Sequence, residues 1–356
     1  IEASDRIRAM AYEDVEDVTE VVDRAEQAIF SVSRRRSSTY FSSIREVANQ
    51  VLDEIENQSD NESGITGMPT SFRRLDAMTA GLQESDLIII AARPSMGKTS
   101  LALNIAQHVA SARRLPVAIF SLEMSKEQLC LRMICSEGRI NAHRLRTGRL
   151  RREEWPRVGE ACARLVEMPI FIDDSPECTA MEIRSKCRRL IAEQKDLGLV
   201  VVDYLQLMRG HKQTENRNQE ITDIARALKA LAKEIKRPVV ALSQLSRAVE
   251  HRNDKRPMLS DLRESGSIEA EADVVIFIYR DSYYRELAKR EAEGKSRDDD
   301  EDTTGVYEGP EPDERVDEAE LIIAKQRNGP TGKVKVAFHP AFARFDNLEM
   351  SLEAPV

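Results

Sequence analysis

One segment near residue 90 constrains the fold of this chain more than any other feature. Residues 87–92 are entirely apolar (Leu-Ile-Ile-Ile-Ala-Ala), Arg-Pro-Ser-Met-Gly-Lys-Thr follows at 93–99, and a helical pattern covers 98–112. A loop between such a strand and helix presents backbone N–H groups to anionic oxygens, with the helix N-terminus behind them. The segment therefore predicts a phosphate-binding loop, formed by Ser95, Met96, Gly97, Lys98, Thr99 and Ser100.

Two side chains of this loop have defined tasks in loops that bind nucleoside triphosphates. Lys98 is placed to reach the β- and γ-phosphates, and the hydroxyl of Thr99 is placed to ligate Mg²⁺. Ala92 stands where the usual pattern has its first glycine, which makes the motif less specific. A plain turn is the alternative, but chance rarely supplies Gly-Lys-Thr together with the flanking strand and helix.

From residue 64 onward, apolar strand patterns alternate with helical patterns, which is typical of a mainly parallel sheet in an α/β domain. We expect strands at 86–92, 116–122, 170–173, 199–203, 239–243 and 274–279, and helices at 98–112, 180–194 and 219–235. Three alternating runs, at 320–325, 333–338 and 343–347, close the chain. The expected organisation is an N-terminal region with a linker helix at 1–36, a connector at 37–63 and one large α/β domain at 64–356.

Three polar side chains stand at the ends of predicted strands, where a ligand of a parallel sheet binds. Asp203 is expected to hold Mg²⁺, although an aspartate that starts a turn is the alternative. Glu123 is a candidate for the group that activates water, and a solvated glutamate at a helix start fits its spacing equally well. Gln244 is either a sensor of the γ-phosphate or a loop residue.

The net charge of −9 is unusual for a protein that binds nucleic acid, but the acidic residues are unevenly distributed. Many of them lie together near the C-terminal end: Asp298, Asp299, Asp300, Glu301, Asp302, Glu308, Glu311, Asp313, Glu314, Asp317 and Glu318. Without them the chain is close to neutral, so a few arginines can still form a local nucleic-acid contact. We expect residues 290–318 to form a disordered surface insertion.

Residues 13–33 predict one amphipathic helix, because apolar residues recur there at spacings of three and four. Its apolar face must be buried, either on its own domain or on a neighbouring subunit. The linker-like residues 33–39 that follow favour the neighbouring subunit. A second amphipathic segment spans 41–56, and a polar break follows at 57–64.

The hydropathy and the cysteines argue against a membrane protein, a zinc site and a disulfide-bonded framework. No stretch approaches the roughly 18 consecutive apolar residues of a membrane span, so no membrane partner is expected. The cysteines form no CxxC pair and number five, which argues against a zinc site and against a disulfide framework. They fit small core residues in a reducing cytoplasm.

Further motifs follow the phosphate-binding loop in a fixed order. They are Phe-Ser-Leu-Glu-Met-Ser at 120–125, Asp-Tyr-Leu-Gln at 203–206, Ala-Leu-Ser-Gln-Leu-Ser-Arg at 241–247, Asp-Leu-Arg-Glu-Ser-Gly at 261–266 and Ala-Lys-Gln-Arg-Asn-Gly-Pro-Thr-Gly at 324–332. Together they resemble the C-terminal domain of the DnaB family of bacterial replicative DNA helicases, from about residue 64 to 347. The resemblance implies a RecA-like P-loop NTPase core, and Ala92 agrees with this family's own version of the loop.

The resemblance also implies an activity. Members of the family are ATP-dependent DNA helicases that use ATP and Mg²⁺, form a homohexameric ring around single-stranded DNA and move 5′ to 3′. ATP lies between subunits, so Lys325 and Arg327 are implied to act on the γ-phosphate of the neighbouring subunit. From the residues alone, two cations at the end of a strand either grip a phosphate or protect an exposed strand edge.

Contact with DNA is implied for Arg263, Glu264 and Gly266, and for Arg217 and Asn218 in a second region. A local ion pair on the surface is the alternative for Arg263 and Glu264. The resemblance further implies that the helix at 13–33 is the linker helix that docks on the adjacent motor domain. Primase and a helicase loader are the partners that it implies.

Two other functions remain open. A RecA-type recombinase would form an open filament on DNA, and a nucleotide-regulated ring platform would lack motor activity. The complete set of expected hydrolytic groups, Glu123, Asp203 and Arg327, argues against the platform, because a switch needs little turnover.

Overall fold

A computed structural model describes residues 2–12, 24–25, 43–59, 64–210, 217–262, 266–292 and 315–348 of the chain. The chain divides into two compact units, Ile1–Gly64 and Ile65–Val356. Among the described helices, none combines the length and the apolar character that crossing a membrane requires.

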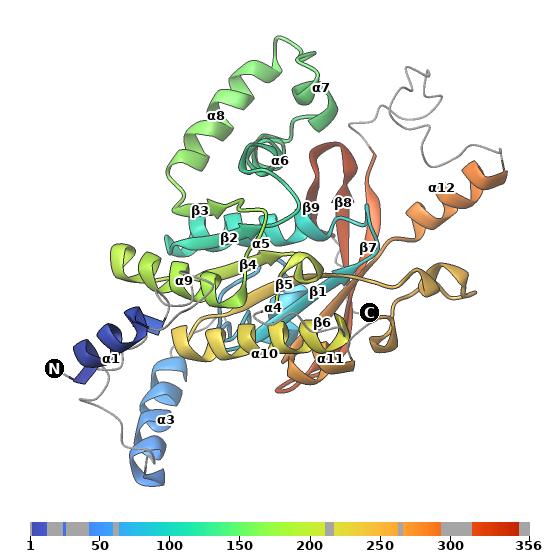
Figure 1. The fold of residues 1–356 in the computed structure, drawn as a ribbon. Helices are drawn as coiled ribbons and strands as arrows, with labels where there is room; N and C mark the ends of the chain where they lie inside the picture. The colour runs from blue at the N-terminus through green and yellow to red at the C-terminus, as the bar shows by residue number, and fades with distance from the viewer. Residues whose placement is uncertain are drawn as a thin grey trace. The chain divides into compact units, whose positions relative to one another are not determined.

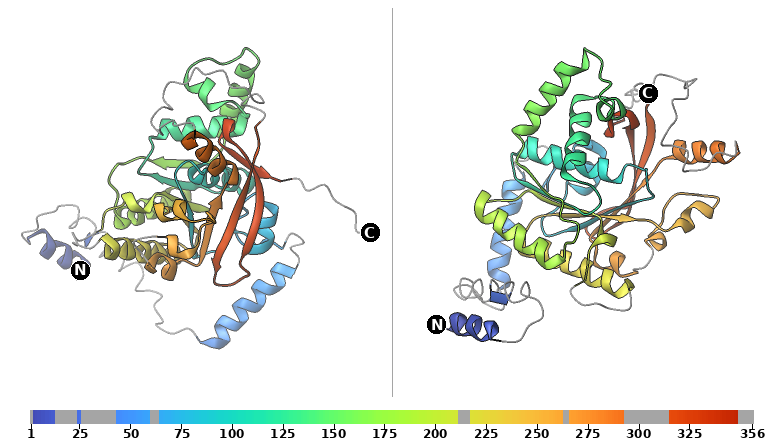
Figure 2. Two further views of the ribbon diagram at one scale, coloured as in Figure 1. Left: turned by 90° about the vertical axis from the view of Figure 1, so that its right-hand side faces the viewer. Right: turned by 45° about the horizontal axis from the view of Figure 1, so that its top comes forward.

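The larger unit is built on one mixed sheet, which the described residues form in the order β3-β2-β4-β5-β1-β6-β7-β8-β9. The strands are β1 (Leu87–Ala92), β2 (Val117–Ser121), β3 (Ile170–Asp173), β4 (Leu199–Asp203), β5 (Val239–Gln244), β6 (Val274–Tyr279), β7 (Asp317–Gln326), β8 (Gly332–His339) and β9 (Arg344–Asn347). The first six are parallel, and β7, β8 and β9 continue the sheet as an antiparallel ribbon, which Figure 2 shows in red tones. The strands expected from the sequence are confirmed.

Helices cover both faces of the parallel part of this sheet. The described helices include α4 (Arg73–Thr79), α5 (Lys98–Arg113), α9 (Ala180–Gln194), α10 (Arg217–Ile235) and α11 (Gly266–Glu271). Right-handed crossovers place α5 on one face, and α9, α10 and α11 on the other, where they lie side by side (Figure 1). The three helices expected from the sequence are confirmed.

Between β2 and β3 the chain forms a helical lobe of α6 (Lys126–Gly138), α7 (Ala142–Arg146) and α8 (Glu154–Val166), visible at the top of Figure 1. Helix α6 begins with a capping box, in which the side chains of Ser125 and Gln128 each bond to the other's backbone N–H. Thr179 and Glu182 form the same arrangement at the start of α9. These reciprocal bonds satisfy N–H groups that the first turn of a helix leaves free.

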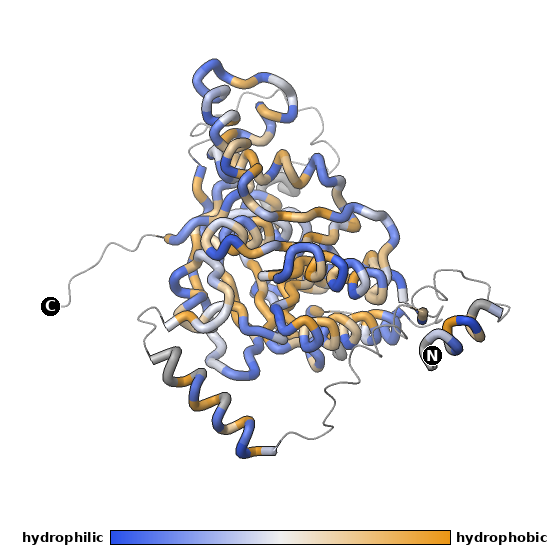
Figure 3. Tube along the Cα trace, turned by 90° about the vertical axis from the view of Figure 1, so that its left-hand side faces the viewer, coloured by the Kyte–Doolittle hydropathy of each residue, from blue (hydrophilic) through white to orange (hydrophobic). Residues whose placement is uncertain are grey.

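The core lies along the parallel strands, where the chain is continuously apolar (Figure 3). Every residue of β1, β2, β4 and β6 is buried. Strands covered by helices on both faces are apolar along their whole length rather than at alternate positions. This rigid core fixes the positions of the loops at the carboxyl ends of the parallel strands.

The two ends of the expected acidic insertion, at about 290 and 318, lie in regular structure. Helix α12 (Asp281–Ala292) extends through the first expected residues, and β7 begins at Asp317. Asp317 is only 5% exposed, because its carboxylate pairs with Arg280 and Arg315. The intervening residues 293–314 lie outside the described part of the chain.

The smaller unit contains α1 (Glu2–Ala11) and α3 (Ile44–Ser59). The amphipathic segment expected at 41–56 is confirmed as a helix, and its hydropathy colours alternate along α3 in Figure 3. Its apolar side chains form one exposed stripe of Ile44, Val47, Val51, Leu52 and Ile55, which are between 37% and 81% exposed. The helix expected at 13–33 lies outside the described residues, except for Arg24 and Ala25.

Candidate nucleotide-binding site

The loop between β1 and α5 has the backbone geometry of a phosphate cradle. Ser95 and Gly97 adopt left-handed conformations, with φ of 65° and 98°. A Cβ atom on Gly97 would lie 2.9 Å from the ring of Phe345, so both the conformation and the space require glycine. Phe345 packs against Phe338 with ring centroids 4.5 Å apart, and this aromatic pair forms the floor of the loop.

The start of the loop is anchored to the strand beside it. Arg93 is buried, and its guanidinium donates to the carbonyl oxygen of Leu245 at 2.8 Å and to Glu250 at 2.9 Å. Both partners follow β5, which pairs with β1 in parallel. The loop therefore begins from a fixed point at the carboxyl edge of the sheet.

Lys98, Thr99 and Asp203 meet at this edge, as the sequence predicts. The Thr99 hydroxyl donates to Oδ2 of Asp203 at 2.7 Å, and Nζ of Lys98 lies 3.5 Å from Oδ1. Asp203 is only 1% exposed, and its Oδ1 accepts no hydrogen bond from any described residue. Lys98 also lies over the ring of Tyr204, 4.1 Å from the centroid.

This arrangement fits Mg²⁺. A hydroxyl and a buried carboxylate with a free oxygen are the hard ligands that Mg²⁺ prefers, and the ion usually takes its other ligands from phosphates and water. The described residues contain no group of three or more His, Cys, Asp or Glu side chains that could hold a metal by themselves. A metal at Thr99 and Asp203 would therefore depend on the nucleotide for further ligands.

Glu123 lies close to this cluster but not in a strand. Strand β2 ends at Ser121, whose hydroxyl donates to the carbonyl oxygen of Met124 at 2.7 Å and closes a bend. The expectation that Glu123 ends the strand is therefore wrong by two residues, and its side chain is exposed on the bend. The residue before it, Leu122, donates its N–H to the carbonyl oxygen of Asp203 at 2.7 Å, which keeps the bend beside the end of β4. Burial and the carboxylates of Glu123 and Asp203 raise the pKa of Tyr204.

Gln244 is the last residue of β5 and lies level with Ala92, where the phosphate-binding loop begins. Its backbone N–H donates to Oε1 of Gln206 at 3.3 Å, and Nε2 of Gln206 donates to the hydroxyl of Ser243 at 2.9 Å. The sequence indicates Gln206 only as part of a family motif. Its position between the ends of β4 and β5 shows that it orients the tip of β5.

Lys325 and Arg327 lie elsewhere. Lys325 pairs in register with Val275 near the amino end of β6, whereas the phosphate-binding loop follows the carboxyl end of β1. Both side chains donate to backbone carbonyls in α11: Lys325 to Glu269 and Ala270, and Arg327 to Ala270 at 2.7 Å. Burial and the neighbouring Arg327 lower the pKa of Lys325. Strand β7 lies between β6 and β8, so protection of an exposed strand edge does not explain the two cations.

The residues expected to contact DNA are only partly described. Arg263 and Glu264 lie outside the described residues, and Gly266 is the first residue of α11. Arg217 begins α10 and donates to the carbonyl oxygens of Gln206 and Met208 at 2.7 and 3.2 Å. The backbone carbonyl of Asn218 accepts a hydrogen bond from Thr222 at 2.7 Å.

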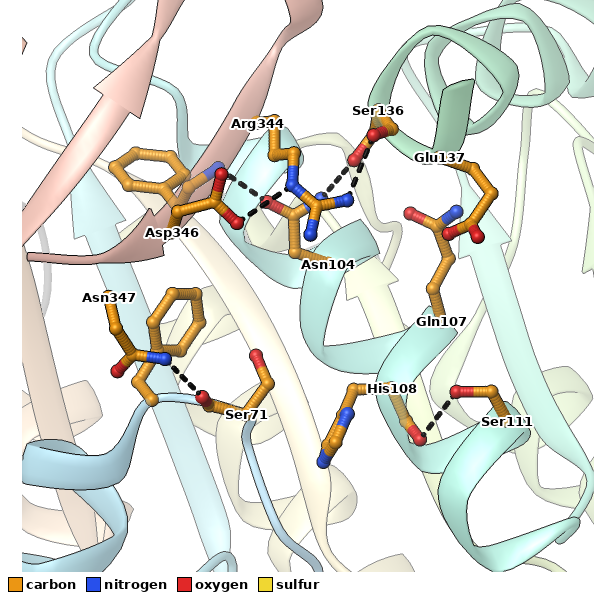
Figure 4. Close-up of a pocket in the computed structure, with 12 residues that line it drawn as sticks. Ser71, Asn104, Gln107, His108, Ser111, Ser136, Glu137, Arg344, Asp346 and Asn347 are labelled. Carbon is orange, nitrogen blue, oxygen red and sulfur yellow. Dashed lines mark hydrogen bonds and ion pairs between the residues drawn. The ribbon is translucent and has the colours of Figure 1, made fainter. Parts of the chain in front are cut away.

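A second, polar pocket of about 180 Å³ lies along α5 (Figure 4) and shares Phe345 with the floor of the phosphate-binding loop. Its polar side chains bond across it to side chains and to backbone carbonyls. Asn104 donates to Ser136 at 2.8 Å, Arg344 donates to the carbonyl oxygen of Ser136 at 2.9 Å, and Asn347 donates to that of Ser71 at 2.8 Å. The pocket is a hydrogen-bonded seam that joins α5, α6 and β9.

Comparisons with known proteins agree with this geometry. The sequence model of the DnaB-like helicase C terminal domain matches residues 67–347. Over 335 residues the chain is 49% identical to the replicative DNA helicase DnaB of Geobacillus stearothermophilus and 48% identical to the replicative DNA helicase DnaC of Bacillus subtilis. Each match covers 94% of this chain and 68% of the relative.

Two solved structures share the fold. One is an isolated ATPase domain, with a TM-score of 0.74 and 38% identity, over 87% of this chain and 100% of that domain. The other is a DnaB-like replicative helicase, described together with its interactions with primase. It has a TM-score of 0.77 and 35% identity, over 98% of this chain and 76% of that protein.

Proposed function

The chain belongs to the DnaB family of replicative DNA helicases, and we propose that its larger unit is the motor that couples ATP hydrolysis to 5′ to 3′ movement along single-stranded DNA and to duplex unwinding. The observation that carries the proposal is the cluster of Lys98, Thr99 and Asp203 at the carboxyl edge of the sheet. Family membership, which the sequence motifs had indicated, is confirmed. The recombinase and the ring platform are not favoured.

Each residue of the cluster has a proposed task. Lys98 and the backbone of residues 95–100 bind the phosphates, and Thr99 with Asp203 holds Mg²⁺, which neutralises phosphate charge when it is bound. Glu123, exposed on its bend, takes a proton from the attacking water. Gln244 reports on the γ-phosphate from the tip of β5, where Gln206 fixes its backbone.

We propose that Lys325 and Arg327 complete the site of a neighbouring subunit in a homohexameric ring. Within one chain they lie at the opposite end of the parallel strands from Lys98, so they do not serve its own phosphates. Cations that stabilise the charge of a transferring phosphoryl group often come from a second subunit. Because both side chains bond to carbonyl groups of α11, movement of α11 would shift them and so change ATP hydrolysis in the neighbouring subunit's site.

Helix α3 provides the apolar surface for assembly. Its exposed stripe, Ile44 to Ile55 on one face, is what a helix that docks on a second copy requires. We therefore propose that α3 docks on a second copy, in addition to the linker helix expected at 13–33. Leu52→Glu together with Ile55→Glu should reduce the hexamer fraction in analytical ultracentrifugation, and Asp53→Lys, on the same helix, should not.

The residues at or just before the starts of α10 and α11 are the proposed DNA contacts: Arg217, Asn218, Arg263, Glu264 and Gly266. Contacts to the sugar-phosphate backbone are independent of sequence, which a motor requires. By analogy with the similar helicase that interacts with primase, we extend that partner to this chain, together with a helicase loader and a cytoplasmic location.

The test is steady-state ATP hydrolysis with and without single-stranded DNA, alongside the particle mass. We expect DNA-stimulated turnover by a hexamer and unwinding of a forked duplex with a 5′ tail. ATP hydrolysis that DNA does not change, by a particle of hexamer mass, would favour the ring platform. DNA-length-dependent open filaments in electron micrographs would favour the recombinase.

A further inference from the structure

A buried arginine supports the phosphate-binding loop from behind. Arg280 directly follows β6, at the end of the sheet where the loop lies, and is 5% exposed. Its Nη1 donates to the carbonyl oxygen of Ser95 at 3.0 Å. The same guanidinium pairs with the buried carboxylate of Asp317 and lies over the ring of Phe338, with its Cζ 4.3 Å from the ring centroid.

The carbonyl that Arg280 holds belongs to a residue in an unfavourable conformation. Ser95 has a φ of 65°, a left-handed geometry that residues other than glycine rarely adopt. Because a peptide group is planar, fixing the Ser95 carbonyl also fixes the peptide that joins Ser95 to Met96. That peptide leads directly to Gly97 and Lys98. The contact therefore determines the path of the loop before any nucleotide arrives.

Burying the guanidinium of Arg280 costs more free energy than a purely structural contact would justify. Removing a guanidinium from water is costly, and replacing a buried ion pair by apolar residues is often neutral or stabilising. Burial lowers the pKa of Arg280 in spite of its partner Asp317, and its Nε has no hydrogen-bond partner within the described ranges. The ion pair of Arg280 and Asp317 holds the guanidinium so that its Nη1 donates to the phosphate-binding loop.

We propose that Arg280 is a positioning residue that holds the loop in its nucleotide-ready conformation, with Asp317 as its counter-charge and Phe338 as its support. The inference rests on the proposed nucleotide-binding function of the loop. Both Nη atoms of Arg280 already have partners, the Ser95 carbonyl and Asp317, so Arg280 acts on the reaction through Ser95. Arg93 has the matching position at the start of the loop, where it bonds to Leu245 and Glu250.

A positioning role predicts a particular kinetic pattern. When the loop is not already ordered, a nucleotide must order it on binding. The apparent affinity then equals the intrinsic affinity multiplied by the fraction of chains whose loop is in the binding conformation. ATP and ADP both carry the phosphates that the loop binds, so their Kd values should rise by the same factor. At saturating ATP the loop is ordered again, so kcat should be nearly unchanged.

The experiment compares Arg280→Lys and Arg280→Gln with the full-length wild-type chain. Lysine keeps the charge but lacks the planar fork that serves Asp317 and Ser95 together. We expect Kd for ATP and ADP, measured with fluorescent analogues, to rise about tenfold in both variants, with kcat within about threefold of wild type. The matched control is Arg285→Gln, because Arg285 is exposed and pairs with Asp281, one helical turn before it.

Thermal unfolding separates positioning from general stability, because a loss of folded molecules lowers the number of active sites without changing the Kd of those that remain. A folded Arg280→Lys with wild-type Kd values would overturn the inference, and so would a lower kcat at unchanged Kd. If neither Arg280 variant folds, Asp317→Asn provides the second test, since it keeps the shape and removes the counter-charge. Unchanged Kd values in Asp317→Asn would then overturn the inference. Failure of the wild type itself to bind ATP would instead overturn the proposed function.

Discussion

Thr99 and Asp203 are joined by a 2.7 Å hydrogen bond although they lie on different elements, the first turn of α5 and the end of β4. The bond uses one carboxylate oxygen and leaves the other, buried beside Lys98, without a hydrogen-bond donor from the described residues. The two side chains therefore hold each other in the geometry in which they would share a metal ion.

Asp203→Asn tests this geometry. The amide keeps the shape of the carboxylate but removes its charge, so we expect the Mg²⁺ concentration for half-maximal ATP hydrolysis to rise about 10- to 100-fold. A Mg²⁺ titration at saturating ATP measures the change. Asp174→Asn is the matched control, because Asp174 follows β3 at the same edge of the sheet and pairs with Lys126. An unchanged Mg²⁺ midpoint in Asp203→Asn would remove Asp203 from the metal site.

Glu123→Gln tests the assignment of the water-activating group. The amide is nearly isosteric but cannot take a proton, so hydrolysis should fall about 10²- to 10⁴-fold while ATP affinity stays at the wild-type value. Single-turnover hydrolysis and equilibrium binding separate the two quantities. Glu127→Gln, exposed on the adjacent first turn of α6, should behave as wild type. Normal turnover in Glu123→Gln would show that another group activates water.

A mixing experiment tests whether Lys325 and Arg327 act between subunits. Lys98→Ala and Arg327→Ala should each be inactive alone. When the two variants are mixed, an interface with the intact loop of one chain and the intact Arg327 of the other is complete, so part of the ATP hydrolysis should return. The mass of mixed particles confirms co-assembly. Co-assembled particles without any recovered activity would contradict action in trans.

Asp86 gives the stability of the larger unit a defined pH dependence. Burial, followed by the nearby carboxylate of Asp273, raises the pKa of Asp86 from 3.8 to about 6. The folded chain therefore retains a proton that the unfolded chain releases, and this contribution to stability is full below pH 3.8 and lost as pH rises through about 6. Asp86→Asn should raise the free energy of unfolding at pH 7 by about 1–2 kcal/mol. Urea unfolding between pH 4 and 7 measures it, and a less stable Asp86→Asn at pH 7 would show that the charged form is favoured.

The strands and the phosphate-binding loop could be predicted because their pattern is local. Parallel strands covered on both faces are continuously apolar, and a strand, a loop and a helix in succession define the cradle without reference to the rest of the chain. The groups that support the cradle could not be predicted in this way. Arg280 and Phe345 lie far from Gly97 in the sequence. The pairing of β1 with β6 brings Arg280 to the loop, and the pairings that run from β6 through β7 and β8 to β9 bring Phe345 there.

The errors have physical causes of the same kind. Asp317 belongs by composition to an acidic segment, but two arginines satisfy its charge and let β7 begin there. Glu123 belongs by hydropathy to the preceding strand, but the hydroxyl of Ser121 ends that strand early. In both cases one or two specific side-chain contacts outweigh the local pattern.

The position of Lys325 and Arg327 at the far end of the sheet from Lys98 affects how many complete catalytic sites an assembly of chains contains. If Lys325 and Arg327 complete a neighbour's site, as we propose, each chain carries two unlike halves of a catalytic site at opposite ends of its sheet, and copies join head to tail. An open row of copies always has one fewer working site than it has chains, with an idle half at each end. Closing the row adds a last working site without adding protein, so turnover per chain rises when the ring shuts.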